Sequence, residues 1–320
     1  MLKLSALLIA IFCLLGVAFT STATIKLNDA SIIDQVNNDP NASWKATSYD
    51  RFEGKTVSEV GHLFGAFLTN GVRPSIYAED RPSENQTSPL RVLPDNFDSR
   101  TKWPKCIHPI RNQEQCGSCW AFSSSEMLSD RFCIASNGAI NTVLSPQFMV
   151  SCDKYDAGCN GGGMDSLWKF LTTTGTVTEE CWPYESGKGH VPSCRSTCVN
   201  GSAMKMYKAD AKSVKNFRKG DVQAIQQDIM DHGPVMSGFM VYQDFMQYSS
   251  GVYHHVTGSL LGGHAIKVVG WGVDSQSKKP YWIIANSWGS TWGMNGFFHI
   301  LRGSNECQIE QYMYTAGPLL

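Results

Sequence analysis

The stretch that decides the fold reads Gln113-Glu114-Gln115-Cys116-Gly117-Ser118-Cys119-Trp120-Ala121-Phe122. The apolar residues that follow, up to Ile134, have mostly helical spacing, which predicts a helix with Ser118 as a candidate N-cap. Cys119 would then lie in the first turn, where the helix dipole and unpaired backbone N–H groups favour a thiolate. Because the thiolate is the reactive form, the pattern predicts a nucleophilic cysteine. An isolated Cys-x-x-Cys pair is equally typical of a disulfide or half of a zinc site, so this pair alone leaves those interpretations open.

The first residues of the chain have the three parts of a secretory signal. Met1-Leu2-Lys3 is followed by an apolar stretch from Leu4 to Phe19 and by small residues up to Ala23. The apolar stretch is short for a membrane-spanning helix, and no later stretch approaches its length. We therefore expect residues 1–22 to be removed and the rest to be free of the membrane, in a lysosome-like or vacuole-like compartment or outside the cell. Sequons at Asn41, Asn85 and Asn200 agree with a glycoprotein of this route.

Charge and cysteine usage narrow the class of protein further. The net charge is −1 and no basic stripe is interleaved with aromatic residues, so nucleic acid is not expected as a partner. The chain has 11 cysteines, and all of them except Cys13 of the signal lie after residue 105. The earlier part is polar and contains a linker at residues 81–89 that would suit proteolytic cleavage. This division indicates a regulatory segment followed by one enzyme of two modest lobes.

A cysteine nucleophile that cleaves peptides needs a histidine to hold the ion pair and to protonate the leaving amine. His264 is the best candidate, because Gly262 to Gly270 reads as a loop that enters a strand. Asn286 ends an aromatic strand and could accept a hydrogen bond from the other ring nitrogen of that histidine, with Trp288 shielding the bond. Taken alone, each of these residues would be read as structural.

The remaining catalytic role is stabilisation of the oxyanion. Gln113 lies six residues before Cys119 and could donate a side-chain N–H to the developing negative charge, with the backbone N–H of Cys119 as the second donor. The four predicted catalytic residues are therefore Cys119, His264, Asn286 and Gln113.

From Leu93 to Leu320 the chain resembles the papain family of cysteine proteases, and specifically its cathepsin B branch. Residues 116–120 match the Cys-Gly-Ser/Ala-Cys-Trp/Tyr signature of that family at every position, and the most specific further stretches are Leu93–Arg100, Gly251–Gly258, Gly262–Gly272 and Gly296–Gly303. The resemblance implies an α+β, papain-like fold in which a helical lobe and a β-barrel lobe flank an active-site cleft. It implies a cysteine endopeptidase that acts on proteins and peptides and needs no cofactor or metal.

The resemblance also implies a disulfide pattern. With Cys119 and Cys307 set aside, eight cysteines remain, and the sequence by itself does not choose among about 105 connectivities. By similarity the pairs are Cys106 with Cys133, Cys116 with Cys159, Cys152 with Cys194, and Cys181 with Cys198. Cys119 then stays free, and Cys307 is expected to be an inert, buried thiol.

Glycines after Cys159 are expected to bind the substrate. A phosphate loop is the alternative, but the stretch lacks the Lys-Ser/Thr ending and the preceding strand. By similarity Gly161 and Gly162 hold the substrate backbone as an added strand. Residues Met164, Ala265 and Tyr312 would line the pocket for the second residue before the scissile bond, and Trp288 completes the expected substrate-binding set. Cathepsin B has a glutamate where Tyr312 stands, so an apolar or aromatic preference is expected.

Two other regions depart from or extend the cathepsin B pattern. The occluding loop, which carries two adjacent histidines in cathepsin B, is replaced by only residues 182–193 with the single His190, and His254-His255 lies on a stretch that matches the family and reads as structural. We therefore expect an endopeptidase that is weak as a dipeptidyl carboxypeptidase. Glu114 stands where the family usually has glycine, with an effect that the sequence does not predict.

Residues 23–92 resemble the short cathepsin B propeptide, which fills the cleft in the reversed direction. This resemblance implies a secreted zymogen, cut near Arg91 to Leu93 to give a mature enzyme of residues 93–320, with its own propeptide and cystatin-type inhibitors as partners. Two alternatives stay open at this point. A thiol-disulfide oxidoreductase using Cys116 and Cys119 would need a thioredoxin-like βαβ pattern, which the sequence does not show, and a binding module could have the same residues without catalysis.

Overall fold

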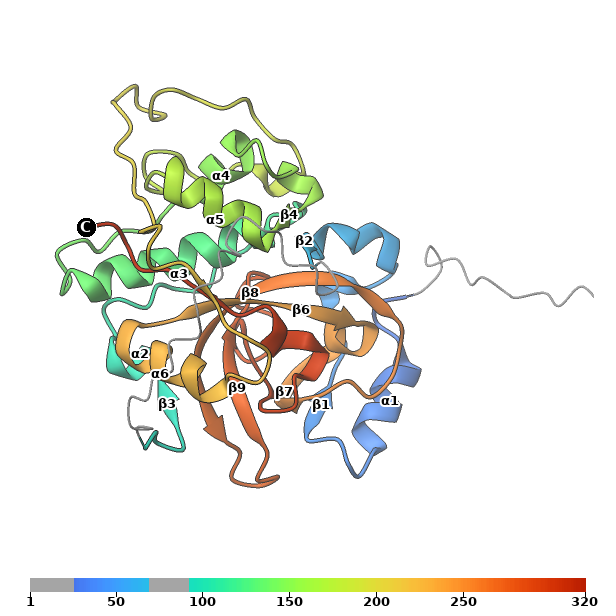
Figure 1. Ribbon diagram of the computed structural model, residues 1–320. Helices are drawn as coiled ribbons and strands as arrows, with labels where there is room; N and C mark the ends of the chain where they lie inside the picture. The colour runs from blue at the N-terminus through green and yellow to red at the C-terminus, as the bar shows by residue number, and fades with distance from the viewer. Residues whose placement is uncertain (1–25, 69–91) are drawn as a thin grey trace, which may run out of the picture.

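The structure is a computed structural model that describes residues 26–68 and 92–320 (Figure 1). The predicted signal peptide, the polar linker, the sequon at Asn85 and Arg91 of the predicted cleavage region lie outside the described residues.

The helices α3 (Cys119–Ala135), α4 (Pro146–Cys152) and α5 (Met164–Thr173) gather in one layer beside a curved sheet (Figure 1). The central helix α3 is buried at every position from Cys119 to Cys133, which explains why its apolar pattern covers more than one face. Against it pack α4 and α5, whereas the short helix α2 (Ser99–Lys102) lies beside the sheet at β8 (Leu260–Val273). Fully buried Trp120, Trp168 and Trp182 fill the core of this layer.

A mixed sheet forms the second layer. Its strands are β1 (Trp44–Ala46), β3 (Phe97–Asp98), β5 (Lys215–Asn216), β6 (Val235–Tyr242), β7 (Tyr248–Tyr253), β8 (Leu260–Val273), β9 (Pro280–Ala285), β10 (Phe297–Leu301) and β11 (Tyr314–Thr315). The order is β1-β7-β10-β9-β8-β6-β11-β5, with β3 on β8, and the pairs are antiparallel except for β7 with β10. Helix α6 (Val222–His232) packs beside β6 and β8.

The predicted α+β class is confirmed, but the described strands do not close into a barrel. Their order ends at β1 on one side and at β5 on the other, so the lobe is an open, curved sheet. Its concave side holds a core of aromatic residues, among which Phe245 contacts Tyr248, Trp292 and Phe298 with ring centroids 4.8–6.3 Å apart. A closed barrel would require pairing between the two end strands, which are short and far apart in the sequence. No local sequence pattern predicts whether such a pairing forms.

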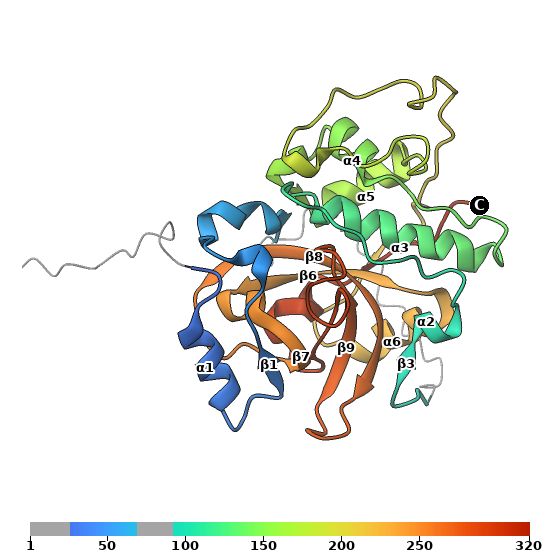
Figure 2. The same ribbon diagram turned by 180° about the vertical axis from the view of Figure 1, so that it is seen from behind.

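The N-terminal segment, residues 26–68, lies against both layers of the mature region. It consists of α1 (Ala30–Asn38), β1, the short 3-10 helices η2 (Asp50–Phe52) and η3 (Val57–Leu63), and β2 (Ala66–Phe67). Strand β1 adds itself to the edge of β7, and the Trp44 indole donates a hydrogen bond to the carbonyl of His254 (2.9 Å). Figures 1 and 2 show this segment in blue along one side of the sheet, from where it reaches the helical layer at β2.

Four disulfides brace the mature region. They join Cys106 to Cys133, Cys116 to Cys159, Cys152 to Cys194 and Cys181 to Cys198, which are the pairs that the resemblance implies. Because Cys116 is bonded to Cys159, it is not available for a redox couple with Cys119. The oxidoreductase interpretation of the Cys-x-x-Cys pair is therefore not supported.

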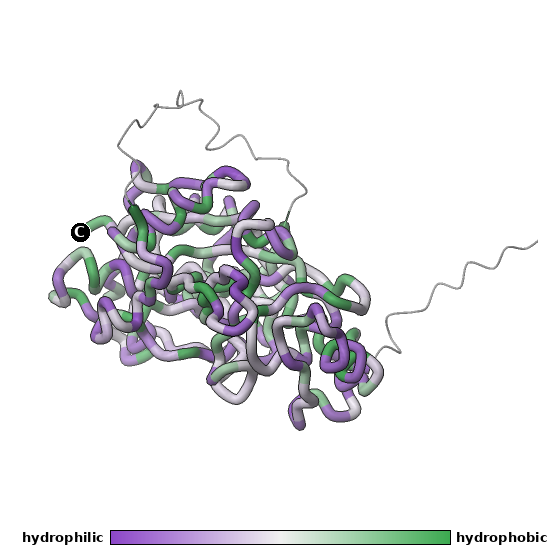
Figure 3. The backbone as a smooth tube through the Cα atoms, turned by 90° about the horizontal axis from the view of Figure 1, so that it is seen from below, coloured by the Kyte–Doolittle hydropathy of each residue, from purple (hydrophilic) through white to green (hydrophobic). Residues whose placement is uncertain are grey.

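Hydrophobic and hydrophilic residues alternate in short runs along the described chain (Figure 3). Within residues 26–68 and 92–320, no helix combines the length and the apolar character that crossing a membrane would require.

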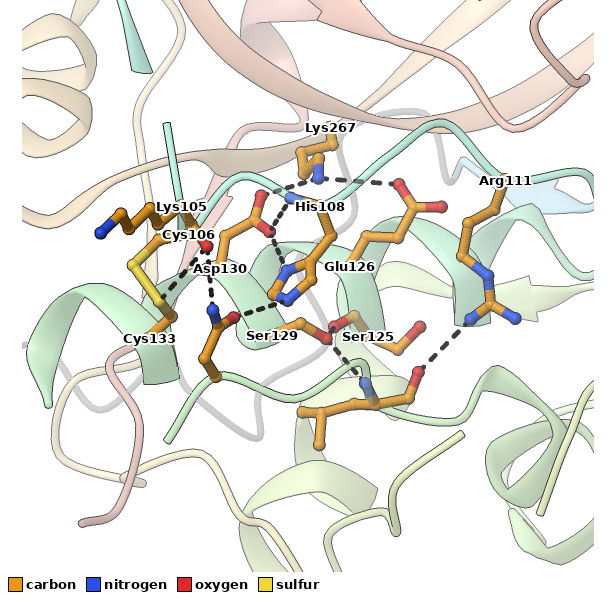
Figure 4. Close-up of polar contacts among 12 residues, drawn as sticks. Lys105, Cys106, His108, Arg111, Ser125, Glu126, Ser129, Asp130, Cys133 and Lys267 are labelled. Atoms are coloured by element: carbon orange, nitrogen blue, oxygen red, sulfur yellow. Dashed lines mark hydrogen bonds and ion pairs between the residues drawn. A yellow bond between two sulfur atoms is a disulfide. The ribbon is translucent and has the colours of Figure 1, made fainter. Parts of the chain in front are cut away.

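A buried charge cluster joins the two layers (Figure 4). Lys267 of β8 places its Nζ 2.7 Å from Oδ2 of Asp130 and 3.9 Å from Oε2 of Glu126, both on α3. His108 contacts the other oxygen of Asp130 at 2.7 Å. Burial raises the pKa of Glu126 to about 7, against the attraction of Lys267 and Arg111. The cluster ties the helix that begins with Cys119 to the strand that carries His264.

We expect Glu126→Gln to reduce the pH dependence of stability. A carboxyl whose pKa is about 7 when folded and 4.5 when unfolded stabilises the fold below pH 4.5, and this contribution is lost as the pH rises through 7. The loss is on the order of 3 kcal/mol by the usual 1.4 kcal/mol per pKa unit. Urea unfolding of the zymogen at pH 5 to 8 measures it. Glu180→Gln, which removes an exposed carboxyl of the same layer, should keep the parent slope, and an unchanged slope in Glu126→Gln would contradict the assignment.

Candidate active site

Cys119 is the first residue of α3 and is fully buried. Ser118 occupies the N-cap position as predicted, but its hydroxyl makes no capping bond. The hydroxyl instead lies 2.9 Å from the phenol oxygen of Tyr184, which also donates to the carbonyl of Gln113 (2.8 Å). Tyr184 thus links the two segments that flank the nucleophile. No local pattern predicts this role of Tyr184, because it depends on a contact across 66 residues.

Residues of the N-terminal segment cover the thiol. Burial raises the pKa of Cys119 to about 11, while the backbone N–H groups of Ala265, Gly65 and the start of α3 lower it by a smaller amount. The start of the helix therefore lowers the pKa of Cys119, as predicted. Exclusion of water from the covered thiol raises this pKa by a larger amount. The contact with Ala265 places the thiol beside the residue that follows His264.

His264 and Asn286 meet across neighbouring strands. His264 lies within β8, Asn286 directly follows β9, and the distance from Nε2 to Oδ1 is 2.7 Å. Because the amide oxygen accepts, Nε2 carries the hydrogen and Nδ1 remains for another partner. The ring of Trp288 lies over His264 with centroids 4.8 Å apart, which shields the bond as expected. Burial lowers the pKa of His264 to about 4, although Asn286 and the carbonyl of Leu63 raise it.

Gln113 is buried beside this group. Its Nε2 donates to the carbonyl of Cys116 (3.0 Å) and lies 3.5 Å from the carbonyl of His62 in the N-terminal segment. Its Oε1 accepts from the hydroxyl of Ser287 (2.8 Å), which fixes the orientation of the amide. Ser287 follows Asn286 directly, so one turn orients both amides. The sequence did not predict this role of Ser287. The only local hint was that Ser287 follows Asn286, since an Asn-Ser pair is typical of a turn.

Of the two predicted substrate-binding glycines, Gly162 begins a short strand, β4 (Gly162–Gly163), that pairs in parallel with β2 of the N-terminal segment, and Gly161 directly precedes it. The N–H of Gly162 donates to the carbonyl of Gly65 (2.9 Å). Gly161 has φ of +114°, and a Cβ on Gly162 would lie 2.5 Å from the ring of Trp120. These positions require glycine because the chain must turn here and approach the indole closely.

The predicted pocket residues Met164, Ala265 and Tyr312 are buried. All three belong to the large apolar core that also includes Ala66, and Leu68 packs against this core. Residues 65–68 therefore lie over the strand and the pocket where substrate is expected. Trp288 is fully buried beneath His264, so in this covered state it supports the histidine and is not itself exposed to the cleft.

The shortened loop, residues 182–193, packs against the segment before the nucleophile. The carbonyl of Gly187 accepts from the N–H of Gln115 (2.8 Å), and the Glu114 carboxylate lies against Gly187. Glu114 has φ of +53°, which is a conformation that glycine adopts at lower cost. His190 at the outer part of the loop is exposed.

The adjacent pair His254-His255 has protein partners away from the nucleophile. His254 lies 3.3 Å from the hydroxyl of Ser43, and His255 contacts the buried carboxylate of Asp244 at 3.2 Å. Within the described residues, no three side chains of the metal-binding kinds gather closely enough to hold a metal ion. These contacts agree with the structural interpretation of both histidines.

Residues 93–316 match the family described as papain family cysteine protease. The chain belongs to the papain family of cysteine proteases. Over 95% of its length the protease is 40% identical to Cathepsin B-like CP2 of Giardia intestinalis, of which it covers 98%. It is 39% identical to Cathepsin B-like cysteine proteinase 6 of Caenorhabditis elegans over 92% of its own length and 84% of that protein.

Among solved structures the protease is similar to proCathepsin B S9 from Trypanosoma congolense, with a TM-score of 0.80, 33% identity, and coverage of 92% of this chain and 99% of that one. The similarity therefore extends through the N-terminal segment, beyond the stretch that the family match covers. The protein is a cathepsin B-like cysteine peptidase, and its likeness to proforms indicates that its propeptide inhibits the enzyme.

Proposed function

We propose that the protease is a cysteine endopeptidase that uses Cys119 as nucleophile, His264 as general base and acid, Asn286 to orient that histidine, and Gln113 to stabilise the oxyanion. The observation that carries the proposal is the 2.7 Å bond between His264 and Asn286, placed beside a free cysteine at the start of a helix. A histidine or a thiol with a purely structural role would need neither a hydrogen-bonded asparagine nor a free cysteine next to it.

In the proposed reaction the Cys119 thiolate attacks the carbonyl carbon of the scissile peptide bond. The negative charge that develops on the carbonyl oxygen is stabilised by the side-chain N–H of Gln113 and the backbone N–H of Cys119. His264 gives its proton to the leaving amine, and a water molecule activated by the same ring then hydrolyses the thioester. In this structure the carbonyl oxygen of His62 lies 3.5 Å from Nε2 of Gln113. It is therefore close to the N–H group that is proposed to stabilise the oxyanion.

We also propose that residues 1–22 are a signal peptide, that residues 23–92 are an inhibitory propeptide, and that residues 93–320 form the mature enzyme. Parallel pairing of β2 with β4 supports an inhibitor that runs opposite to substrate. By excluding water, the covering segment disfavours both the thiolate and the imidazolium, as the raised pKa of Cys119 and the lowered pKa of His264 indicate. Removal of the segment would let both groups return toward an ion pair.

This route would place the enzyme in the secretory pathway, in a lysosome-like or vacuole-like compartment or outside the cell, with cystatin-type inhibitors as partners of its open cleft. Asn200 supports glycosylation, because its Oδ1 accepts from both the N–H and the hydroxyl of Ser202 in an exposed turn (3.0 and 2.7 Å). Asn41 is exposed as well.

The short loop leads us to expect internal cleavage in preference to release of C-terminal dipeptides. His190 is the only histidine in residues 182–193, so the loop has no adjacent histidine pair to bind a substrate carboxylate, and a single imidazole contact provides little orientation. A peptide of about ten residues with a blocked N-terminus is digested in two forms, with a free and with an amidated C-terminus, and products are identified by mass spectrometry. We expect both forms to be cut internally at rates within about 2-fold of each other, as for a site that does not bind the carboxylate. Dipeptide release at the rate of internal cleavage, abolished by amidation, would contradict the proposal.

Tyr312 is expected to favour an apolar or aromatic residue in the second position before the scissile bond. The tyrosine is only 6% exposed and belongs to the same apolar core as Met164 and Ala265, and its neutral phenol cannot form the ion pair with an arginine that a glutamate would form. A Phe-Arg fluorogenic substrate should be cleaved at least about 10-fold faster than an Arg-Arg substrate.

Tyr312→Glu should raise cleavage of the Arg-Arg substrate relative to the Phe-Arg substrate. Tyr281→Glu is the matched control, because that tyrosine stacks on His299 away from the predicted pocket. Faster cleavage of Arg-Arg than of Phe-Arg by the parent enzyme would refute the predicted preference.

A further inference from the structure

Two carboxyl groups contact each other in the loop between α4 and β4. Asp153 follows the last residue of α4 and is 8% exposed, and Asp156 lies three residues further on. Each carboxyl is within hydrogen-bonding reach of the other. In the described part of the chain no lysine, arginine or histidine is among the groups that act on either one. No ion pair joins either carboxyl to a cation in the described residues: Lys154, which lies between them in the sequence, is exposed, and Nζ of Lys169 lies over the ring of Tyr155 (4.3 Å).

The contacts of the two groups leave one oxygen on each without a donor. Oδ1 of Asp153 accepts from the N–H of Tyr155 (2.8 Å), and Oδ1 of Asp156 accepts from the N–H of Gly163 (2.7 Å) and the hydroxyl of Ser166 (2.6 Å). The Oδ2 atoms of both aspartates are buried, and no donor reaches them from the described residues. Since an unpaired buried acceptor is unfavourable, a proton between the two groups would satisfy both.

The electrostatics agree with one shared proton. Burial, followed by the neighbouring Asp156, raises the pKa of Asp153 to about 7, although the N–H of Tyr155 lowers it. Burial also raises the pKa of Asp156, against the hydrogen bonds from Ser166 and Gly163. Asp156 receives the stronger set of donors, so it is the ionised partner and Asp153 holds the proton.

The pair is connected to the proposed substrate strand by a single peptide unit. Gly163, whose N–H is held by Asp156, is the second residue of β4, and Gly162 is the first. Ser166, the other donor to Asp156, lies in the first turn of α5. Displacement of the Asp156 carboxylate would therefore move the main chain that pairs with residues 65–67 in this structure.

We propose that Asp153 and Asp156 share one proton and that this proton positions β4, so that its loss weakens the binding of extended peptides. The inference rests on the proposed function, because it takes Gly161 and Gly162 as the substrate strand. Asp156 is a positioning residue and Asp153 supplies its proton. Below pH 7 the proton holds the two carboxyls together, and above it two adjacent carboxylates repel each other and release the loop.

The test compares two substrates of the processed enzyme between pH 5 and pH 8. A blocked tripeptide amide reaches β4, whereas a blocked single-residue amide with the same leaving amine is too short to do so. The ratio of their kcat/KM values therefore cancels the titration of Cys119 and His264, which act on both substrates in the same way. We expect this ratio to fall on the order of 10-fold with rising pH in the parent enzyme, and to stay flat in Asp153→Asn, whose amide donates to Asp156 at every pH. Glu180→Gln should behave as the parent.

A second variant and a second readout keep the outcomes distinct. Asp156→Asn also removes the titrating pair, so it should flatten the ratio even if Asp153→Asn does not fold. In the intact zymogen, carbon NMR of labelled aspartate should show one carboxyl that titrates near neutral pH, that is absent from Asp153→Asn, and that titrates at lower pH in Asp156→Asn, where the neighbouring charge is gone. A parent ratio that is flat, or a variant ratio that falls as in the parent, overturns the proposal. Failure to hydrolyse either substrate would count against the proposed function, while the NMR titration would still decide the shared proton.

Discussion

Cys119→Ala is expected to lower peptidase activity by a factor of at least about 10⁴, because the nucleophile and its histidine act as one unit. The second free thiol provides a matched control. Cys307 is partly buried beside Glu306, with Sγ 3.3 Å from the carboxylate, and burial together with that charge raises the pKa of its thiol. Cys307→Ser should therefore retain the parent activity.

The measurement uses a Phe-Arg fluorogenic substrate and an epoxysuccinyl probe, after both variants and the parent have been processed by the same added protease. The parent and Cys307→Ser should be labelled at Cys119 only, and Cys119→Ala should not be labelled. Probe attachment to Cys307, or more than about 1% of the parent activity in Cys119→Ala, would contradict the assignment of the nucleophile.

Gly65→Ala in the propeptide is expected to weaken its inhibition of the mature enzyme on the order of 100-fold, or about 3 kcal/mol. A Cβ on Gly65 would lie inside contact distance of the backbone of Gly117, two residues before the nucleophile, and backbone cannot move aside as a flexible side chain can. The same displacement would break the bond from the N–H of Gly162 to the carbonyl of Gly65.

Gly61→Ala is the control for this substitution. Gly61 lies in the same segment, and a Cβ there meets nothing within 4 Å. Peptides covering residues 23–92 are added to the mature enzyme, and the inhibition constants of the parent, Gly61→Ala and Gly65→Ala sequences are compared. Equal constants for the two variants would mean that residues 65–67 do not hold the cleft closed in solution.

The sequence was sufficient for the family, the α+β class and the kinds of residue that the chemistry needs, because these depend on local patterns. The helix after Ser118 and the strands around His264 and Asn286 have their own periodicity, and the structure places all of them as helix or strand. The contact between His264 and Asn286 was predicted from the chemistry that a cysteine nucleophile needs. It could not be predicted from residue spacing, because spacing does not determine the register of two strands such as β8 and β9.

Other features of the site depend on contacts between distant segments. Tyr184 and Ser287 orient the oxyanion side of the site through bonds that span 71 and 174 residues. The raised pKa of Cys119 results from covering by residues 63–66, which a helix-dipole argument at the nucleophile could not include. The pairing of Asp153 with Asp156 was missed for a different reason. Acidic residues three apart in a loop usually point to solvent, and only burial reveals that they meet.

Strand β1 has a consequence for the life of the enzyme after activation. While it is present, it pairs with β7 and covers the edge of the sheet, and Trp44 packs against the rings of Tyr248 and Tyr253. If the propeptide leaves as proposed, one edge of β7 presents unpaired N–H and C=O groups beside these two rings, which is the kind of edge through which proteins aggregate. The proposed cleavage would therefore also remove a protective cover from the sheet.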